Sequence, residues 1–149
     1  MNRMDSLIEW YQTLSPETVN RVPEFYDERA RFRDPFNDVR GHHAIIAIFQ
    51  HMFDNSEQPR FVIDERQQHN HCYWISWHFH VTLMGKAIEI EGASRLDLAE
   101  DGRIIRHLDY WDASDLFAQL PLIGTIVCKL KHRLQAPCLV AAKNSRQQR

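Results

Sequence analysis

The last predicted strand of this sequence holds a histidine and an aspartate whose spacing suits acid–base chemistry. His107, Asp109 and Trp111 are separated by single residues, and every second residue of a strand points to the same face of its sheet. Because Trp111 favours the buried face, His107 and Asp109 are predicted to share it, together with Ile105. An aspartate enclosed by apolar side chains has a raised pKa, so such a group is a stronger base when ionised and an acid near neutral pH.

This environment suits the abstraction of a proton next to a carbonyl group. In that chemistry a base removes the proton, a tyrosine or serine hydroxyl holds the enolate, and the proton returns at another position. The alternative is a structural role, in which Asp109 pairs with His107 or with an arginine, because structural ion pairs also perturb carboxyl groups. The sequence leaves both roles open.

The elements that must position these residues follow from hydrophobic periodicity. Apolar residues at helical spacing predict helices at 4–14, 16–26 and 41–53, of which the second begins at Pro16 after a Ser15 cap and is kinked at Pro23. A short strand is predicted at 30–33. From residue 60 the period changes to two, which predicts strands at 61–64, 71–83, 86–96 and 103–111. Helices are predicted from 114 and over 122–134, and this order favours an α+β fold.

The Met84-Gly85 turn fixes the register of the central predicted hairpin, because a two-residue turn pairs Leu83 with Lys86. Three pairs on the buried face follow from this register: Phe79 with Ile90, Trp77 with Gly92, and Ile75 with Ser94. The aspartate and histidine of the last strand are therefore expected to face a largely apolar enclosure.

Two histidines on the opposite face of this hairpin raise the alternative of a metal site. The register sets His78 opposite Glu91 and His80 opposite Glu89. These residues lie away from the predicted pocket, so cross-strand charge pairs at a subunit contact are the expected role. No metal site is predicted.

Composition excludes several classes of protein. A formal net charge of -2 gives no basic field for nucleic acid. Cys72, Cys128 and Cys138 lack the spacing of a zinc site or a disulfide framework. The N-terminus has no secretory signal pattern, and no stretch reaches the length of a membrane span. We therefore expect a cytoplasmic protein with no membrane partner.

Several motifs resemble known families. Tyr11, Phe25-Tyr26-Asp27, the segment 32–36 and Gly41 resemble the N-terminal half of ketosteroid isomerases, and Tyr110-Trp111 resembles their last strand. The segment 108–112, followed by 120–122, is similar to limonene-epoxide hydrolases and SnoaL-like polyketide cyclases. The resemblance implies the nuclear-transport-factor-two-like (NTF2-like) fold that these families share. In that fold a curved antiparallel sheet wraps around N-terminal helices and a central pocket, here as one domain over 1–136 with a C-terminal helix and a flexible tail at 137–149.

The resemblance also implies roles for individual residues. Asp34 falls on the isomerase's proton-shuttling base, Tyr11 on its oxyanion tyrosine, and Tyr26 on a supporting tyrosine. Ser94 stands where the isomerase has a protonated acid, and Gln50 where it has another network tyrosine, so the match to a steroid isomerase is incomplete. A serine still donates one hydrogen bond.

Asp109 instead matches the catalytic aspartate of the cyclases and epoxide hydrolases. The arginine and second acid of the epoxide hydrolases have no counterpart on the inner face of 71–83, so epoxide opening is not expected. The candidate catalytic residues are thus Asp34 or Asp109 as base, Tyr11 as oxyanion donor and His107 as orienting or relaying group. The candidate substrate-contacting residues are aromatic or carry a hydroxyl: Ser94, Trp77, Trp111, Phe49, Phe53 and Tyr26.

Structural alternatives stand beside these roles. Asp34 can cap its own Asp-Pro turn, Tyr11 can be a core tyrosine with one partner, and the aromatic residues can belong to the core. The enzyme hypothesis needs Asp34 or Asp109 to be desolvated and open to a cavity. It loses support if Asp34 points to solvent and Asp109 is consumed in an internal ion pair.

Two functions remain open. The first is a small enzyme of the isomerase, dehydratase or cyclase type that acts on a hydrophobic carbonyl compound without cofactor or metal. The second is a non-catalytic module that binds a hydrophobic ligand or mediates dimerisation. The resemblance implies a homodimer through the outer sheet face. The basic-edged helix after Pro121 is expected to pack over the pocket or on a partner rather than on a membrane.

Overall fold

The computed structural model describes residues 2–136. Contacts divide the chain into two compact units, residues 1–113 and residues 114–149, and each is described by itself. That residues 1–136 form one domain stays a prediction. The predicted flexible tail at 137–149, which includes Cys138, lies outside the described residues. Within the described part of the chain, no helix is long and apolar enough to cross a bilayer.

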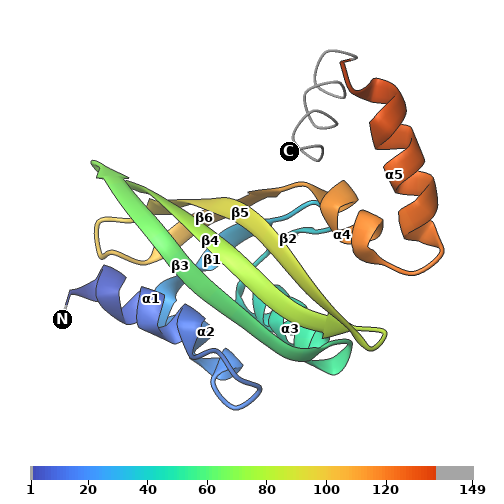
Figure 1. The fold of residues 1–149 in the computed structure, drawn as a ribbon. Coiled ribbons are helices and arrows are strands. Elements are labelled where there is room, and N and C mark those ends of the chain that lie inside the picture. The colour runs from blue at the N-terminus through green and yellow to red at the C-terminus, as the bar shows by residue number, and fades with distance from the viewer. Residues whose placement is uncertain (1, 137–149) are drawn as a thin grey trace. The chain divides into compact units, whose positions relative to one another are not determined.

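The first unit contains three α-helices, one 3-10 helix and one sheet, whose arrangement is drawn in Figure 1. Its elements are, in chain order, α1 (Arg3–Gln12), the 3-10 helix η1 (Val19–Arg21), α2 (Val22–Phe25), β1 (Tyr26–Arg33), β2 (Asp38–Arg40), α3 (His42–Asp54), β3 (Glu57–His69), β4 (Cys72–Leu83), β5 (Lys86–Leu98) and β6 (Ile104–Trp111). The strands form one curved sheet in the order β2-β1-β6-β5-β4-β3. The predicted α+β fold is confirmed.

Neighbouring strands are antiparallel with one exception, which the sequence did not predict: β1 and β6 are parallel. A parallel pair requires a long connection, and here the connection runs through α3 and the three long strands β3, β4 and β5. This pair joins the first strand, which begins at Tyr26, to the last strand, which holds His107 and Asp109.

Helix α1 brings Tyr11 to the concave side of the sheet. A capping box starts the helix, because the backbone of Asp5 donates to the Asn2 side chain at 2.8 Å while Asp5 accepts from the Asn2 backbone. The buried face then recurs at helical spacing through Met4, Leu7 and Tyr11.

The predicted helix at 16–26 is wrong in extent. Ser15 does not cap a helix; its carbonyl oxygen accepts from Thr18 and Val19 in a turn, and η1 follows. Pro23 lies in the first turn of the short α2, where its missing N–H is tolerated, so the helix restarts there. Tyr26 is already extended, with φ -110° and ψ 141°, and β1 is correspondingly longer than the predicted strand.

The central hairpin has the predicted register. Phe79 pairs with Ile90, Trp77 with Gly92, and Ile75 with Ser94. Met84 and Gly85 both have positive φ, at 51° and 74°, as the tight turn between two twisted strands requires.

Strand β6 departs from the prediction at one residue. Ile105 was expected on the inner face, but it is 44% exposed while Ile104 is fully buried. Leu98 pairs with Ile104 and Asp97 with Arg106, so Ile105 is the extra residue of a bulge. His107 and Asp109 lie beyond the bulge and keep the inner face.

The outer-face histidines contact acidic residues: His80 contacts Glu89, which lies directly opposite as predicted, whereas His78 contacts Asp64 on β3 rather than the opposite Glu91. His78 Nδ1 lies 2.6 Å from Asp64 Oδ2 on β3, and His80 Nδ1 lies 3.4 Å from Glu89 Oε2. Among residues 2–136, no three His, Cys, Asp or Glu side chains come together as a metal site would require.

We predict that Gly92→Ala lowers the free energy of unfolding by about 1–3 kcal/mol, as overpacking does. A Cβ at this position would lie 2.6 Å from Cζ2 and 2.9 Å from Cζ3 of the Trp77 ring. Urea denaturation measures the effect. In a Trp77→Phe background, which removes those ring atoms, the same substitution should cost less. An equal cost in both backgrounds would show that the ring does not restrict this site.

Candidate active site

A small cavity lies between the helices and the inner face of the sheet. Its volume is about 30 Å³, enough for roughly two water molecules. Its apolar lining comes from Phe49, Phe61, Ile63, Ile75 and Trp77. Its polar lining comes from four residues on α1, β5 and β6: Tyr11, Ser94, His107 and Asp109.

The polar residues are joined in a continuous hydrogen-bond chain. The indole Nε1 of Trp77 donates to Ser94 Oγ at 2.8 Å, and the Ser94 hydroxyl donates to Asp109 Oδ1. His107 Nε2 lies 2.7 Å from the same Oδ1. Two donors are thus directed to one carboxylate oxygen.

On its other ring nitrogen, His107 contacts two tyrosines. Its Nδ1 lies 2.7 Å from the Tyr26 hydroxyl and 3.3 Å from the Tyr11 hydroxyl. The two hydroxyl oxygens are themselves 2.5 Å apart. The chain therefore runs from Asp109 through His107 and Tyr26 to Tyr11, and both of its ends line the cavity.

Sheet register assembles this chain from residues that are distant in sequence. Ser94 pairs with Ile75 on one side and with Asp109 on the other, while Leu96 pairs with His107. Because side chains alternate between the two faces, Ser94, His107 and Asp109 all project from the inner face. A slip of one residue in β5 or β6 would send them to the opposite side.

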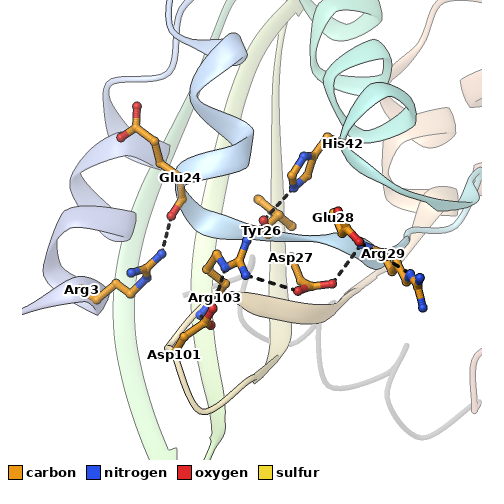
Figure 2. A network of polar contacts seen from close by, with 9 residues as sticks. All are labelled: Arg3, Glu24, Tyr26, Asp27, Glu28, Arg29, His42, Asp101 and Arg103. Carbon is orange, nitrogen blue, oxygen red and sulfur yellow. Dashed lines mark hydrogen bonds and ion pairs between the residues drawn. The ribbon is translucent and has the colours of Figure 1, made fainter.

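Tyr26 is held by contacts around the start of β1 (Figure 2). His42 Nε2 donates to the Tyr26 carbonyl oxygen at 2.7 Å. Beside it, Arg103 donates to Asp101 at 2.8 Å and lies 3.6 Å from Asp27. These contacts join α3 and the β5–β6 turn to β1, so the backbone that carries the central tyrosine is fixed from two sides.

Burial keeps both tyrosines protonated. Tyr11, Tyr26, Ser94 and His107 are all buried. Loss of water around the phenols raises the pKa of Tyr11 and of Tyr26 far above the ordinary value, and the negative charge of Asp109 raises both further. Each phenol is therefore a neutral hydrogen-bond donor at physiological pH.

One oxygen of Asp109 remains for a ligand. The side chain is 14% exposed, and no residue among 2–136 makes a hydrogen bond to its Oδ2. The pairing with His107 therefore occupies one carboxylate oxygen and leaves the other without a hydrogen bond from residues 2–136.

The direction of the hydrogen bonds depends on His107. An ionised carboxylate only accepts, so Nε2 carries a proton when Asp109 is ionised. If Nδ1 is unprotonated, Tyr26 donates to it and Tyr11 donates to Tyr26. If His107 is an imidazolium, Nδ1 donates to Tyr26, Tyr26 donates to Tyr11, and the Tyr11 proton is directed away from the chain.

Of the ten candidate site residues, six line the cavity: Tyr11, Phe49, Trp77, Ser94, His107 and Asp109. Tyr26 lies behind them in the hydrogen-bond chain. Phe53 is half-buried on α3 and does not line the cavity. Trp111 packs edge-on against Phe36, with ring centroids 5.5 Å apart, and also lies outside the lining.

Asp34 is placed in the turn after β1 rather than at the cavity. Its Oδ1 accepts from the backbone N–H groups of Phe36 and Asn37, both at 2.7 Å, and the Asn37 side chain donates to both carboxylate oxygens. This geometry is that of the turn-capping alternative. The role of Asp34 as a base stays a prediction, and Asp34 is not among the residues that line the cavity.

Three lining residues were not among the candidates: Phe61, Ile63 and Ile75. The sequence did contain their signal, because Phe61 and Ile63 alternate with other residues on β3, and Ile75 shares the inner face with Trp77. What it lacked was the position of β3 relative to α1 and α3.

Residues 7–107 match the model of the SnoaL-like domain family. The match covers more than half of the chain, so the protein belongs to that family. A search of curated protein sequences returned no match.

Solved structures share the NTF2-like fold. An NTF2-like protein of unknown function from Burkholderia pseudomallei is 17% identical with a TM-score of 0.71, over 81% of this chain and 98% of that one. A candidate SnoaL-like polyketide cyclase from Jannaschia is 11% identical with a TM-score of 0.68, over 80% and 91%. An epoxide hydrolase from M. tuberculosis is 16% identical with a TM-score of 0.63, over 86% and 92%. At these identities the likeness concerns the fold.

We predict that the stability of the protein falls as the pH rises above about 10, the ordinary pKa of tyrosine. Below that value Tyr11 and Tyr26 are neutral in folded and unfolded chains alike. Above it the unfolded chain releases both protons, whereas the folded chain retains them because their pKa values are raised. Each phenol then removes about 1.4 kcal/mol of stability per pH unit.

Urea denaturation between about pH 9 and 11 measures this slope. The Tyr11→Phe/Tyr26→Phe variant, which lacks both phenols, should show a shallower dependence. Equal slopes in the two proteins would mean that these phenols ionise in the folded state.

Proposed function

We propose that this protein is a cofactor-independent proton-transfer enzyme, of the isomerase, cyclase or lyase type, that acts on a small hydrophobic carbonyl compound. One observation carries the proposal: Asp109 lines a largely apolar cavity and is held through a single oxygen by Ser94 and His107, while no residue among 2–136 makes a hydrogen bond to its other oxygen. A base oriented in this way, with little water around it, is suited to remove a proton bound to carbon.

In this proposal Asp109 Oδ2 accepts the substrate proton. The two donors on Oδ1 fix the plane of the carboxylate. The lone pair of Oδ2 that accepts the proton is therefore held in a fixed orientation. General-base catalysis of this kind contributes about 10²–10⁴ in rate. His107 offsets the charge of Asp109 when it is an imidazolium, and a buried carboxylate is more stable when so paired.

Tyr11 donates to the oxygen on which negative charge develops. The imidazolium form of His107 turns the tyrosine hydroxyls so that Tyr11 has a proton to offer to the cavity. The raised pKa of Tyr11 keeps that proton on the phenol. A preorganised donor in a site without bulk water stabilises an enolate more strongly than a solvated donor does.

Substrate binding requires the cavity to widen. A volume of about 30 Å³ is smaller than any hydrophobic carbonyl compound. Phe61 and Ile63 are half-buried on β3, which is an edge strand paired only with β4. Displacement of these two side chains opens the cavity without disturbing Asp109 or His107, which lie on β6.

The same cavity supports a second candidate function, a non-catalytic module for a hydrophobic ligand. The apolar lining of Phe49, Phe61, Ile63, Ile75 and Trp77 favours such a ligand whether or not it reacts. A binding module tolerates the loss of the Asp109 charge, whereas the enzyme does not.

We predict that Asp109→Asn lowers catalysed exchange of α-protons by about a hundredfold or more, because an amide cannot accept the proton. Proton NMR of enolisable hydrophobic ketones in deuterium oxide measures this exchange. Asp34→Asn is the matched control, and it should retain the wild-type rate per folded molecule. Ketone binding, measured separately by calorimetry, should survive in both variants.

If the Asp109→Asn variant exchanges α-protons at the wild-type rate, this aspartate is not the base. If the wild type binds ketones and exchanges none of their protons, the protein is the binding module instead.

We also propose a homodimer formed through the outer sheet face. Trp74 and Tyr110 stack there with centroids 5.8 Å apart and are 43% and 45% exposed. Arg95 and Arg106 lie toward one end of this face, where both pair with Asp97, and the charged groups around the aromatic pair thus have partners within the chain. A two-fold axis near the aromatic pair would bury these two rings against their symmetry copies.

Trp74→Glu should convert the dimer to a monomer, because it places a charge in the apolar centre of the contact. Sedimentation velocity measures the mass. Met84→Glu adds the same charge at the exposed hairpin turn and should leave the dimer intact. A monomeric wild type, or a Trp74→Glu variant that remains dimeric, would contradict this interface.

A further inference from the structure

Helix α5 (Ile123–Leu134) carries an apolar stripe that is exposed to solvent. Together with the residue that precedes the helix, the stripe consists of Leu122, Ile123, Ile126, Leu130 and Leu134, whose exposed fractions range from 51% to 88%. At 3.6 residues per turn these side chains fall on one side of the helix. Figure 1 shows α5 as one continuous helix.

Cations flank this stripe on both sides. On a helical projection, Lys131 falls next to one edge of the stripe, and Lys129 and Arg133 fall next to the other. Lys131 also pairs with Asp115 on α4 (Ala113–Gln119). Long basic side chains at such edges can bury their methylene groups along an apolar surface while their charges reach a polar layer.

Charge is distributed very unevenly along the chain. All 20 acidic residues lie at or before Asp115, whereas six of the 18 lysines and arginines follow it. The net charge of -2 therefore divides into -8 over residues 1–115 and +6 over residues 116–149. The partner that complements α5 is an anionic one.

Leu122 adds an independent observation. Its φ is +64°, a left-handed conformation that favours glycine or asparagine. The chain instead places a leucine there with 88% of its surface exposed. Close by, Gly124 makes the tight α4–α5 turn possible, because a Cβ would lie 2.5 Å from the Ala118 carbonyl oxygen. The strained leucine extends the apolar stripe by one side chain beyond the helix.

We propose that α5 lies on the surface of a membrane that contains anionic lipids, with the stripe inserted among the acyl chains and the flanking cations at the phosphate groups. An apolar stripe bordered by lysine and arginine is what such a surface binds. The helix is too short to span a bilayer, so it lies in the interface. A nucleic acid would use the cations but not the stripe. The proposal departs from the expectation of no membrane partner, and it does not depend on the proposed catalytic function.

Flotation of the full chain with lipid vesicles tests the proposal. The wild type should bind vesicles of phosphatidylcholine that contain phosphatidylglycerol, bind pure phosphatidylcholine weakly, and be released by salt. Lys129→Gln/Arg133→Gln should lower binding roughly thirtyfold, since each cation near an anionic surface contributes about a factor of five. Arg29→Gln/Lys86→Gln makes the same change of net charge on the first unit and should bind as the wild type does.

The apolar half of the contact is tested by Ile126→Ser/Leu130→Ser, which keeps every charge and should also lose binding. Circular dichroism and thermal unfolding of each variant establish that the fold is retained. Failure of the wild type to float with anionic vesicles would overturn the proposal. Vesicle binding that the serine variant retains in full would overturn insertion of the stripe and leave the cations as the whole contact. If the wild type does not bind vesicles and forms a dimer that the serine substitutions dissociate, the stripe binds a second copy of the chain instead.

Discussion

The carboxylate of Asp109 is the interaction on which the inner face of this sheet depends. A charged group in an apolar enclosure is stable only when its neighbours satisfy it, and Ser94 and His107 do so through a single oxygen. Their own remaining polar atoms then need partners, which Trp77 and Tyr26 supply. Tyr11 completes the sequence of contacts. Among the described residues, no buried side-chain nitrogen or oxygen is left without a partner.

The hydrogen bonds that satisfy these buried groups therefore contribute both to the stability of the fold and to the geometry of the site. Removing one member of the chain leaves a buried donor or acceptor unsatisfied, at a cost of about 1–3 kcal/mol. The members come from α1, β1, β4, β5 and β6, so the hydrogen bonds hold the first unit together as well as orienting one carboxylate. The parallel pairing of β1 with β6 places Tyr26 within reach of His107, 81 residues further along the chain.

The two units differ in physical character. The first unit buries its polar chemistry and carries 19 of the 20 acidic residues of the protein, whereas the second exposes an apolar stripe among cations. Sheet register and core packing govern the first. Local helix geometry and the tight turn at Gly124 govern the second, so the two surfaces can serve separate purposes within one chain.

The sequence by itself determined the α+β order, the central hairpin and the face on which His107 and Asp109 lie. These follow from local rules, because periodicity assigns side chains to faces and a two-residue turn fixes register. Only the tertiary structure placed the two aspartates. Asp109 lines the cavity, whereas Asp34 accepts hydrogen bonds from the backbone of its own turn, and the sequence pattern of an Asp-Pro turn does not show where its carboxylate will lie. The bulge at Ile105, the contact between Tyr26 and His107 and the small volume of the cavity depend on how distant segments pack, and a linear pattern does not encode that packing.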